Sequence, residues 1–185
     1  MGRAYKNFWS LNTDEAVVAG ILRAETSKDV EVFLPLNAQM KDVDLICVNM
    51  KTKKMLTIQV KGSRAYEPKE KKIGDFCEGS GGWFLISKRK VEESTADFFI
   101  FLVYVLEQDK ENGRILIRPH TISIPTRELK RLVRDYKVTH GKDAYSFKFW
   151  VNPKKKLAFD FRDKKYYVSE YLDKRGFERL NNYLV

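Results

Sequence analysis

The stretch LTIQVKGSR (residues 56–64) predicts a β-strand whose two faces differ in chemistry. Successive side chains of a strand point to opposite sides, so its apolar residues alternate onto one face and Thr57, Gln59 and Lys61 onto the other. An amide and an ammonium group therefore lie two residues apart within apolar sequence. This polar face is either exposed to solvent or part of a functional site. The sequence of the neighbouring segments indicates which alternative applies.

A helix and two strands precede this stretch. Residues 13–25 predict a helix, because Asp14 and Glu15 stand in its first turn and apolar residues follow on nearly every side. Residues 30–36 and 43–50 predict two strands, and a link of hairpin length joins the second to the third strand, 54–61. The order is one helix followed by three strands.

The rest of the chain continues this α/β pattern. Residues 62–82, rich in Gly, Lys and Glu, predict a loop. A short helix could lie within this loop or in residues 87–95, but the sequence does not fix its position. The later elements are expected as strands at 97–107, 114–119, 145–151 and 157–161, and as helices at 125–136 and 168–184. We therefore expect a mixed central sheet flanked by helices over residues 1–136, with residues 137–185 adding a β-hairpin and a helix packed on that core.

The composition favours a polyanionic partner. The chain has 185 residues, which suits one domain, and 35 Lys and Arg against 25 Asp and Glu give a net charge of +10. Nucleic acid is the commonest partner of such a charge, although solubility alone is an alternative. The sequence has no secretory signal, no apolar run long enough to span a membrane, and no cysteine spacing typical of a zinc site, so a cytoplasmic protein is expected.

Asp44 adds a carboxylate to the polar face of the strand. It opens the apolar run of residues 45–48, on the strand that pairs with Gln59 and Lys61. Carboxylate and amide oxygens suit Mg²⁺ or Mn²⁺, and a lysine can deprotonate water or stabilise charge on a phosphate. Each residue alone has a simpler explanation, as a strand end or a solvated face. Together they indicate a site that hydrolyses a phosphodiester.

Asp44, followed fifteen residues later by Gln59-Val60-Lys61, resembles the PD-(D/E)xK nuclease superfamily, with glutamine in place of the usual acid. Glu15 resembles the helical carboxylate of Holliday-junction resolvases in that superfamily. The resemblance covers roughly residues 8–135 and implies a restriction-endonuclease-like core. It also implies a homodimeric, Mg²⁺- or Mn²⁺-dependent endodeoxyribonuclease. Asp44, Glu15, Gln59 and Val60 would be the metal ligands, and Lys61 would assist the attack of water.

The sequence departs from that pattern in two ways. Val43 stands before Asp44 where the family has proline, and Asp42 on the same strand face is a rival ligand. The neutral Gln59 removes one negative charge, which weakens Mg²⁺ binding unless Glu15 restores it. Two alternatives therefore remain: a catalytically degenerate module that binds nucleic acid on the same fold, and an unrelated α/β interaction protein.

The segment after Lys61 is strongly basic. A solvated loop would account for this charge without any binding function. The segment is adjacent to the proposed site, however, and this favours contacts with DNA phosphates. The residues expected to make these contacts are Arg64, Tyr66, Lys69, Lys71 and Lys72.

Overall fold

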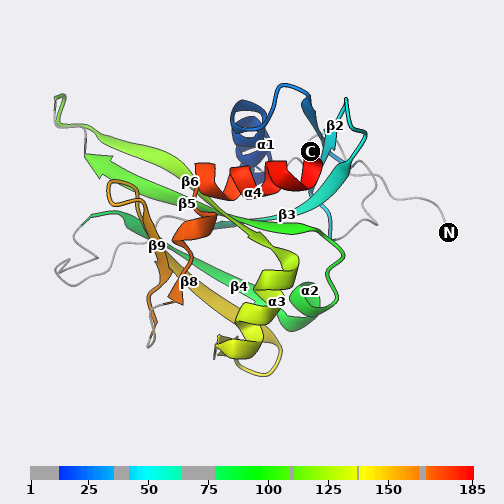
Figure 1. The fold of residues 1–185 in the computed structure, drawn as a ribbon. Coiled ribbons are helices and arrows are strands. Elements are labelled where there is room, and N and C mark those ends of the chain that lie inside the picture. Colours follow the sequence, from blue (N-terminus) through cyan, green and yellow to red (C-terminus); the bar gives the residue numbers. More distant parts are fainter. Residues whose placement is uncertain (1–12, 36–41, 64–77, 109–110, 137, 163–165) are drawn as a thin grey trace.

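The computed structural model describes residues 13–35, 42–63, 78–108, 111–136, 138–162 and 166–185. Within these ranges the protein is an α/β structure with four α-helices around a mixed, curled five-stranded sheet (Figure 1). In spatial order its strands are β1 (Val30–Phe33), β2 (Leu45–Asn49), β3 (Met55–Ser63), β5 (Phe98–Gln108) and β6 (Ile115–Pro125). β3 and β5 run parallel, whereas the other neighbours run antiparallel. The expectation of an α/β protein with a mixed central sheet is confirmed.

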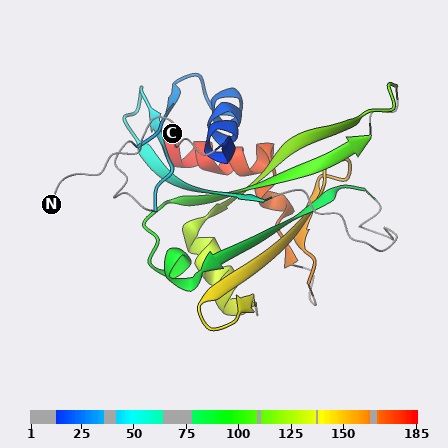
Figure 2. The same cartoon turned by 180° about the vertical axis from the view of Figure 1, so that it is seen from behind.

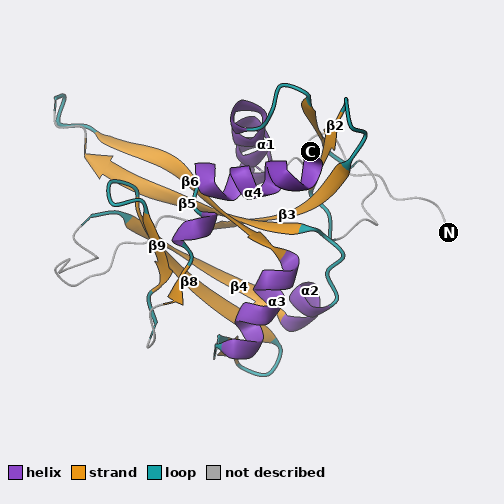
Figure 3. Ribbon diagram, in the orientation of Figure 1, coloured by secondary structure: helices purple, strands orange, loops and turns teal. Residues whose placement is uncertain are grey.

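Helices α1 (Thr13–Glu25) and α4 (Lys174–Leu184) lie together on one face of this sheet (Figure 3). Val18 of α1 and Phe177 of α4 belong to the same buried cluster as Ile58 and Val60 of β3. The apolar side of β3 therefore faces the helices, as the alternation predicts. The polar side of β3 faces the opposite way.

A second sheet and helices α2 (Lys88–Glu92) and α3 (Thr126–Asp135) lie on that opposite face (Figure 2). The strands of the second sheet are β4 (Ser80–Ser87), β8 (Ala144–Asn152), β9 (Leu157–Asp160) and β10 (Tyr166–Tyr167), with β7 (Thr139–His140) paired to β8. Phe101 of β5 anchors the core between the sheets. Its ring centroid lies 5.0 Å from those of Phe84 and Phe149 and 5.5 Å from that of Phe147.

The predicted loop over residues 62–82 is wrong at both ends. β3 continues to Ser63, and β4 already begins at Ser80. Glycine is required in β4, because a Cβ at residue 82 would overlap the ring of Phe84 and press on Val103 of β5. A glycine-rich segment that resembles a loop in sequence is thus a strand that crosses close to the central sheet.

The C-terminal region also differs from its prediction. A 3-10 helix, η3 (Ser169–Tyr171), precedes α4, so the single helix predicted over residues 168–184 is divided, with Asp173 between the two parts at φ +46°. β8 pairs with β4 along the full length of β4, so residues after 137 complete a sheet that begins within the expected core. None of the helices in the described parts of the chain is both long and apolar enough to cross a membrane.

Candidate active site

Asp44 is fixed opposite Gln59 by the β2–β3 pairing. Its backbone N–H donates to the carbonyl oxygen of Ile58 at 2.8 Å, which extends the ladder one residue before β2. Its side-chain Oδ2 accepts hydrogen bonds from Gln59 Nε2 and, at 2.8 Å, from the backbone N–H of Val60. Asp44 is only 8% exposed and Gln59 only 3%. Two hydrogen-bond donors of the neighbouring strand therefore fix the buried Asp44 carboxylate in one position.

Lys61 follows on the same face of β3. Its Nζ donates to the carbonyl oxygen of Val60 at 2.9 Å. Burial lowers the pKa of Lys61 from its ordinary 10.5 to about 8, and the charge of Lys90 adds to this lowering. Three carboxylates raise the pKa in opposition: Asp44, Glu15 and Asp42. A larger fraction of Lys61 is therefore neutral near physiological pH than of an exposed lysine.

The two other predicted carboxylates act on this cluster through their charges. Glu15 and Asp42 are close enough for their charges to raise the pKa of Lys61. Asp44, rather than its rival Asp42, makes the hydrogen bonds to Gln59 and Val60. The charge of Asp42 also acts on the pKa of Arg89, near the start of α2.

The oxygens of this cluster fit a divalent cation in part. Gln59 Oε1 is buried and has no hydrogen-bond partner within the described ranges, so an electron-rich atom is left unsatisfied. The Asp44 carboxylate is bonded to the same amide group, and the next residue supplies the Val60 carbonyl, which accepts from Lys61 Nζ. Oxygen donors of these kinds suit Mg²⁺. The described residues contain no group of three or more His, Cys, Asp and Glu placed to hold a metal. A cation here would therefore depend on at most two carboxylates of the described residues, together with amide and carbonyl oxygens.

Gly62 and Asp14 bring the start of α1 against the end of β3. A Cβ at residue 62 would overlap the Asp14 carboxylate. Asp14 Oδ1 accepts a hydrogen bond from the Tyr104 hydroxyl of β5 at 2.9 Å. Burial, together with this bond and the charge of Asp14, raises the pKa of Tyr104 to about 12. The first turn of α1, which carries Glu15, is thereby held beside Lys61.

Residues of β4 and α2 also border the cluster, and the sequence did not single them out. Lys90 acts on the pKa of Lys61, and Arg89 stands next to it on α2. The backbone N–H of Trp83 donates to Ser63 Oγ at 2.8 Å, so β4 meets β3 two residues after Lys61. The basic run SKRK at residues 87–90 was the signal available in the sequence, but only the crossing of β4 over β5 shows that it lies near Lys61.

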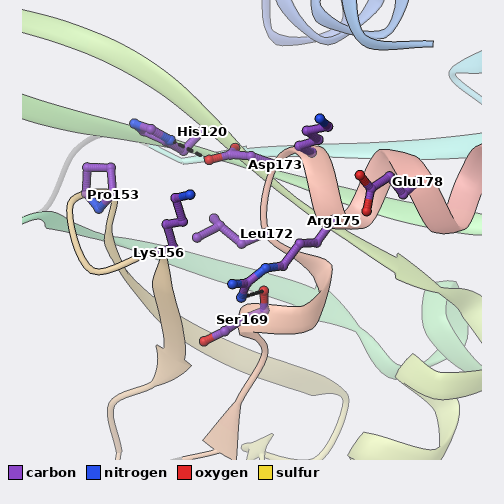
Figure 4. A pocket seen from close by; sticks show the side chains of 9 residues that line it. His120, Pro153, Lys156, Ser169, Leu172, Asp173, Arg175 and Glu178 are labelled. Atoms are coloured by element: carbon purple, nitrogen blue, oxygen red, sulfur yellow. Dashed lines mark hydrogen bonds and ion pairs between the residues drawn. The ribbon is translucent and has the colours of Figure 1, made fainter. Parts of the chain in front are cut away.

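A separate pocket of about 420 Å³ opens where β6, the β8–β9 turn and the start of α4 meet (Figure 4). Lys156 and Arg175 project toward it from opposite sides. Asp173 connects its walls, because Oδ2 lies 2.8 Å from His120 Nδ1 and Oδ1 accepts the backbone N–H of Thr121 at 2.8 Å. These bonds fasten α4 to β6, so His120 and Asp173 have a structural function here.

The five residues predicted to contact DNA, Arg64, Tyr66, Lys69, Lys71 and Lys72, lie outside the described residues. Comparisons of the chain with protein families, with curated proteins and with solved structures found no match.

Proposed function

We propose that the protein is a metal-dependent endodeoxyribonuclease with a restriction-endonuclease-like core and the Asp44–Gln59–Lys61 cluster as its active site. The observation that carries the proposal is a buried, doubly hydrogen-bonded carboxylate next to a lysine with a pKa of about 8. Lysines whose pKa is lowered in this way, beside a fixed carboxylate, are typical of catalytic sites. The order of α1, three antiparallel strands and a parallel fourth strand, β5, is compatible with such a core.

The residues of the cluster have distinct functions in hydrolysis. Neutral Lys61 accepts a proton from the attacking water, whose oxygen forms the new bond to phosphorus while the bond to the leaving oxygen breaks. Asp44 holds Gln59 and Val60 in position and, by its charge, sets how readily Lys61 takes up the proton. A bound Mg²⁺ or Mn²⁺ would supply stabilisation of the negative charge on the phosphate. Asp44, Gln59, the Val60 carbonyl and Glu15 are the residues that would hold it.

Cleavage of supercoiled plasmid DNA with Mg²⁺ or Mn²⁺ tests the proposal. Lys61→Met should lower the rate by about 100-fold or more, because it removes a general base of nearly the same size. Lys28→Met, at an exposed lysine after α1, is the matched control and should cleave like the wild type. Equal rates in all three proteins would overturn the assignment of Lys61. Cutting of both strands also implies a homodimer, which light scattering of the protein bound to DNA would detect.

One observation favours a second function. The described residues bring no three metal-ligating side chains together, and Gln59 is neutral where the family has an acid, as expected of a site that has lost metal binding and retains nucleic-acid binding. Mn²⁺ titration followed by NMR separates the two functions. Line broadening centred on residues 44 and 59–61 supports the nuclease, whereas salt-sensitive DNA binding without such broadening supports the binding module.

A further inference from the structure

Trp83 presents a large aromatic ring to solvent in a fixed orientation. The residue is 54% exposed, on the face of β4 that points away from the core residues Phe84 and Ile86. Its indole Nε1–H donates to Ser146 Oγ of β8 at 2.9 Å, and its backbone N–H donates to Ser63 Oγ of β3 at 2.8 Å. Ser146 is only 3% exposed, so the indole is anchored to a buried group. A ring held in this way loses little conformational entropy when another ring stacks on it.

The surroundings of the ring are basic as well as apolar. Lys148, opposite Trp83 on β8, places its Nζ 5.4 Å from the centroid of the ring. Leu85, two residues further along the same face of β4, is 57% exposed. An exposed aromatic ring with a cation beside it is the arrangement that proteins use to bind single-stranded nucleic acid, with a base on the ring and a phosphate near the cation.

The backbone of Trp83 lies close to the strand that carries the candidate active site. It is hydrogen-bonded to Ser63, which is two residues after Lys61 on the same face of β3. Lys90, whose charge acts on the pKa of Lys61, lies on α2, which directly follows the strand that carries Trp83. A strand of nucleic acid with a phosphate at Lys61 would therefore pass near Trp83.

We propose that Trp83 is a stacking platform for an unpaired base, with Lys148 as the contact for the adjoining phosphate. Bases within a duplex are stacked on one another, so an exposed indole can receive only a base that has left the helix. The preferred ligand is thus single-stranded DNA, or DNA with an unpaired segment. The inference deepens the proposed function by naming its substrate, but binding at Trp83 requires no cleavage.

Binding of a fluorescein-labelled oligothymidylate to the full chain without metal tests the platform. Fluorescence anisotropy should show about tenfold weaker binding for Trp83→Ala and little change for Trp83→Phe, because phenylalanine still stacks. Ile115→Ala, which truncates another exposed apolar side chain on the distant end of β6, should bind like the wild type. An abasic oligonucleotide of equal length carries the same charge without bases. It should bind the wild type and Trp83→Ala equally.

Tryptophan emission gives a second readout. Oligothymidylate should quench the wild type, and most of the quenching should disappear in Trp83→Phe while the affinity remains. Unchanged affinity in Trp83→Ala, or equal binding of the abasic and thymidylate strands by the wild type, would overturn the platform. The first outcome would favour a protein partner at this face.

The two proposals fail separately. Binding that depends on Trp83, without cleavage in the presence of Mg²⁺ or Mn²⁺, retains the platform and overturns the nuclease. Cleavage that depends on Lys61, together with binding that does not change when Trp83 is replaced, retains the nuclease and overturns the platform.

Discussion

Lys61 keeps an ammonium group in a partly buried position, and its pKa of about 8 reflects the cost of that burial. An unfolded chain has lysine pKa values near 10.4. Between about pH 8 and pH 10.4 the unfolded chain therefore binds more protons than the folded chain, so stability rises with pH across this window. Below it, the full cost of the buried charge is present.

Lys61→Met removes this cost. We expect the free energy of unfolding at pH 7 to rise by about 2 kcal/mol, since each pKa unit is worth about 1.4 kcal/mol and the solvent that Lys61 retains screens part of the effect. The gain should shrink when urea unfolding is repeated at pH 9.5. A gain of the same size at both pH values would show that methionine acts through packing rather than through charge.

Asp44 provides the largest opposing effect on the same pKa. Asp44→Asn keeps an oxygen for the Val60 N–H but removes the negative charge, so the pKa of Lys61 should fall below 8. An NMR titration of the lysine side chain measures this directly. Asp135→Asn, at an exposed carboxylate on α3, should leave the titration unchanged. An unchanged pKa in Asp44→Asn would mean that Asp44 does not influence Lys61.

At the scale of elements, the contact between α1 and β3 depends on Gly62. Gly62→Ala would place a methyl group where the Asp14 carboxylate lies, so that side chain must move and give up its hydrogen bond from Tyr104. We expect a loss of about 1–3 kcal/mol in the free energy of unfolding, measured by urea denaturation. Asp14 adjoins Glu15 in the first turn of α1, so an accompanying change in the pKa of Lys61 would show that the turn itself moves.

Gly20→Ala is the matched control on the same helix. No atom lies within 4 Å of a Cβ at residue 20, so alanine should raise stability by about 0.5–1 kcal/mol through helix propensity alone. Asp14→Ala in the Gly62→Ala background should recover part of the loss. Purely additive effects would contradict a direct clash between residues 14 and 62.

The elements that the sequence predicted well are those with a clear local pattern. The helix at 13–25 has the predicted bounds, and β5 and α3 differ from their predictions by one residue at each end. β4 was missed because its signals are non-local. Gly82 lies against Val103 of β5, and Gly81 lies against Phe161 and Trp150, contacts that no window of neighbouring residues contains.

At the scale of the whole molecule, residues 137–185 are integral to the core. Phe147 and Phe149 of β8 pack against Phe101 of β5. A chain ending at residue 136 would leave this face of the central sheet exposed. We therefore expect that truncated chain to lack a cooperative urea transition by near-ultraviolet circular dichroism, whereas the full chain shows one. A sharp transition in the truncated chain would mean that residues 1–136 form an independent domain.

The sequence by itself determined the composition of the candidate site and its local geometry. Period-two alternation places Gln59 and Lys61 on one face, and a hairpin brings Asp44 opposite Gln59, since both features depend only on nearby residues. The tertiary structure alone decided the environment of that site. The pKa of Lys61 depends on burial and on charges from α1 and α2, and the position of Trp83 depends on β4 meeting β3. Burial and long-range contact arise from packing between distant segments, which spacing along a chain does not encode.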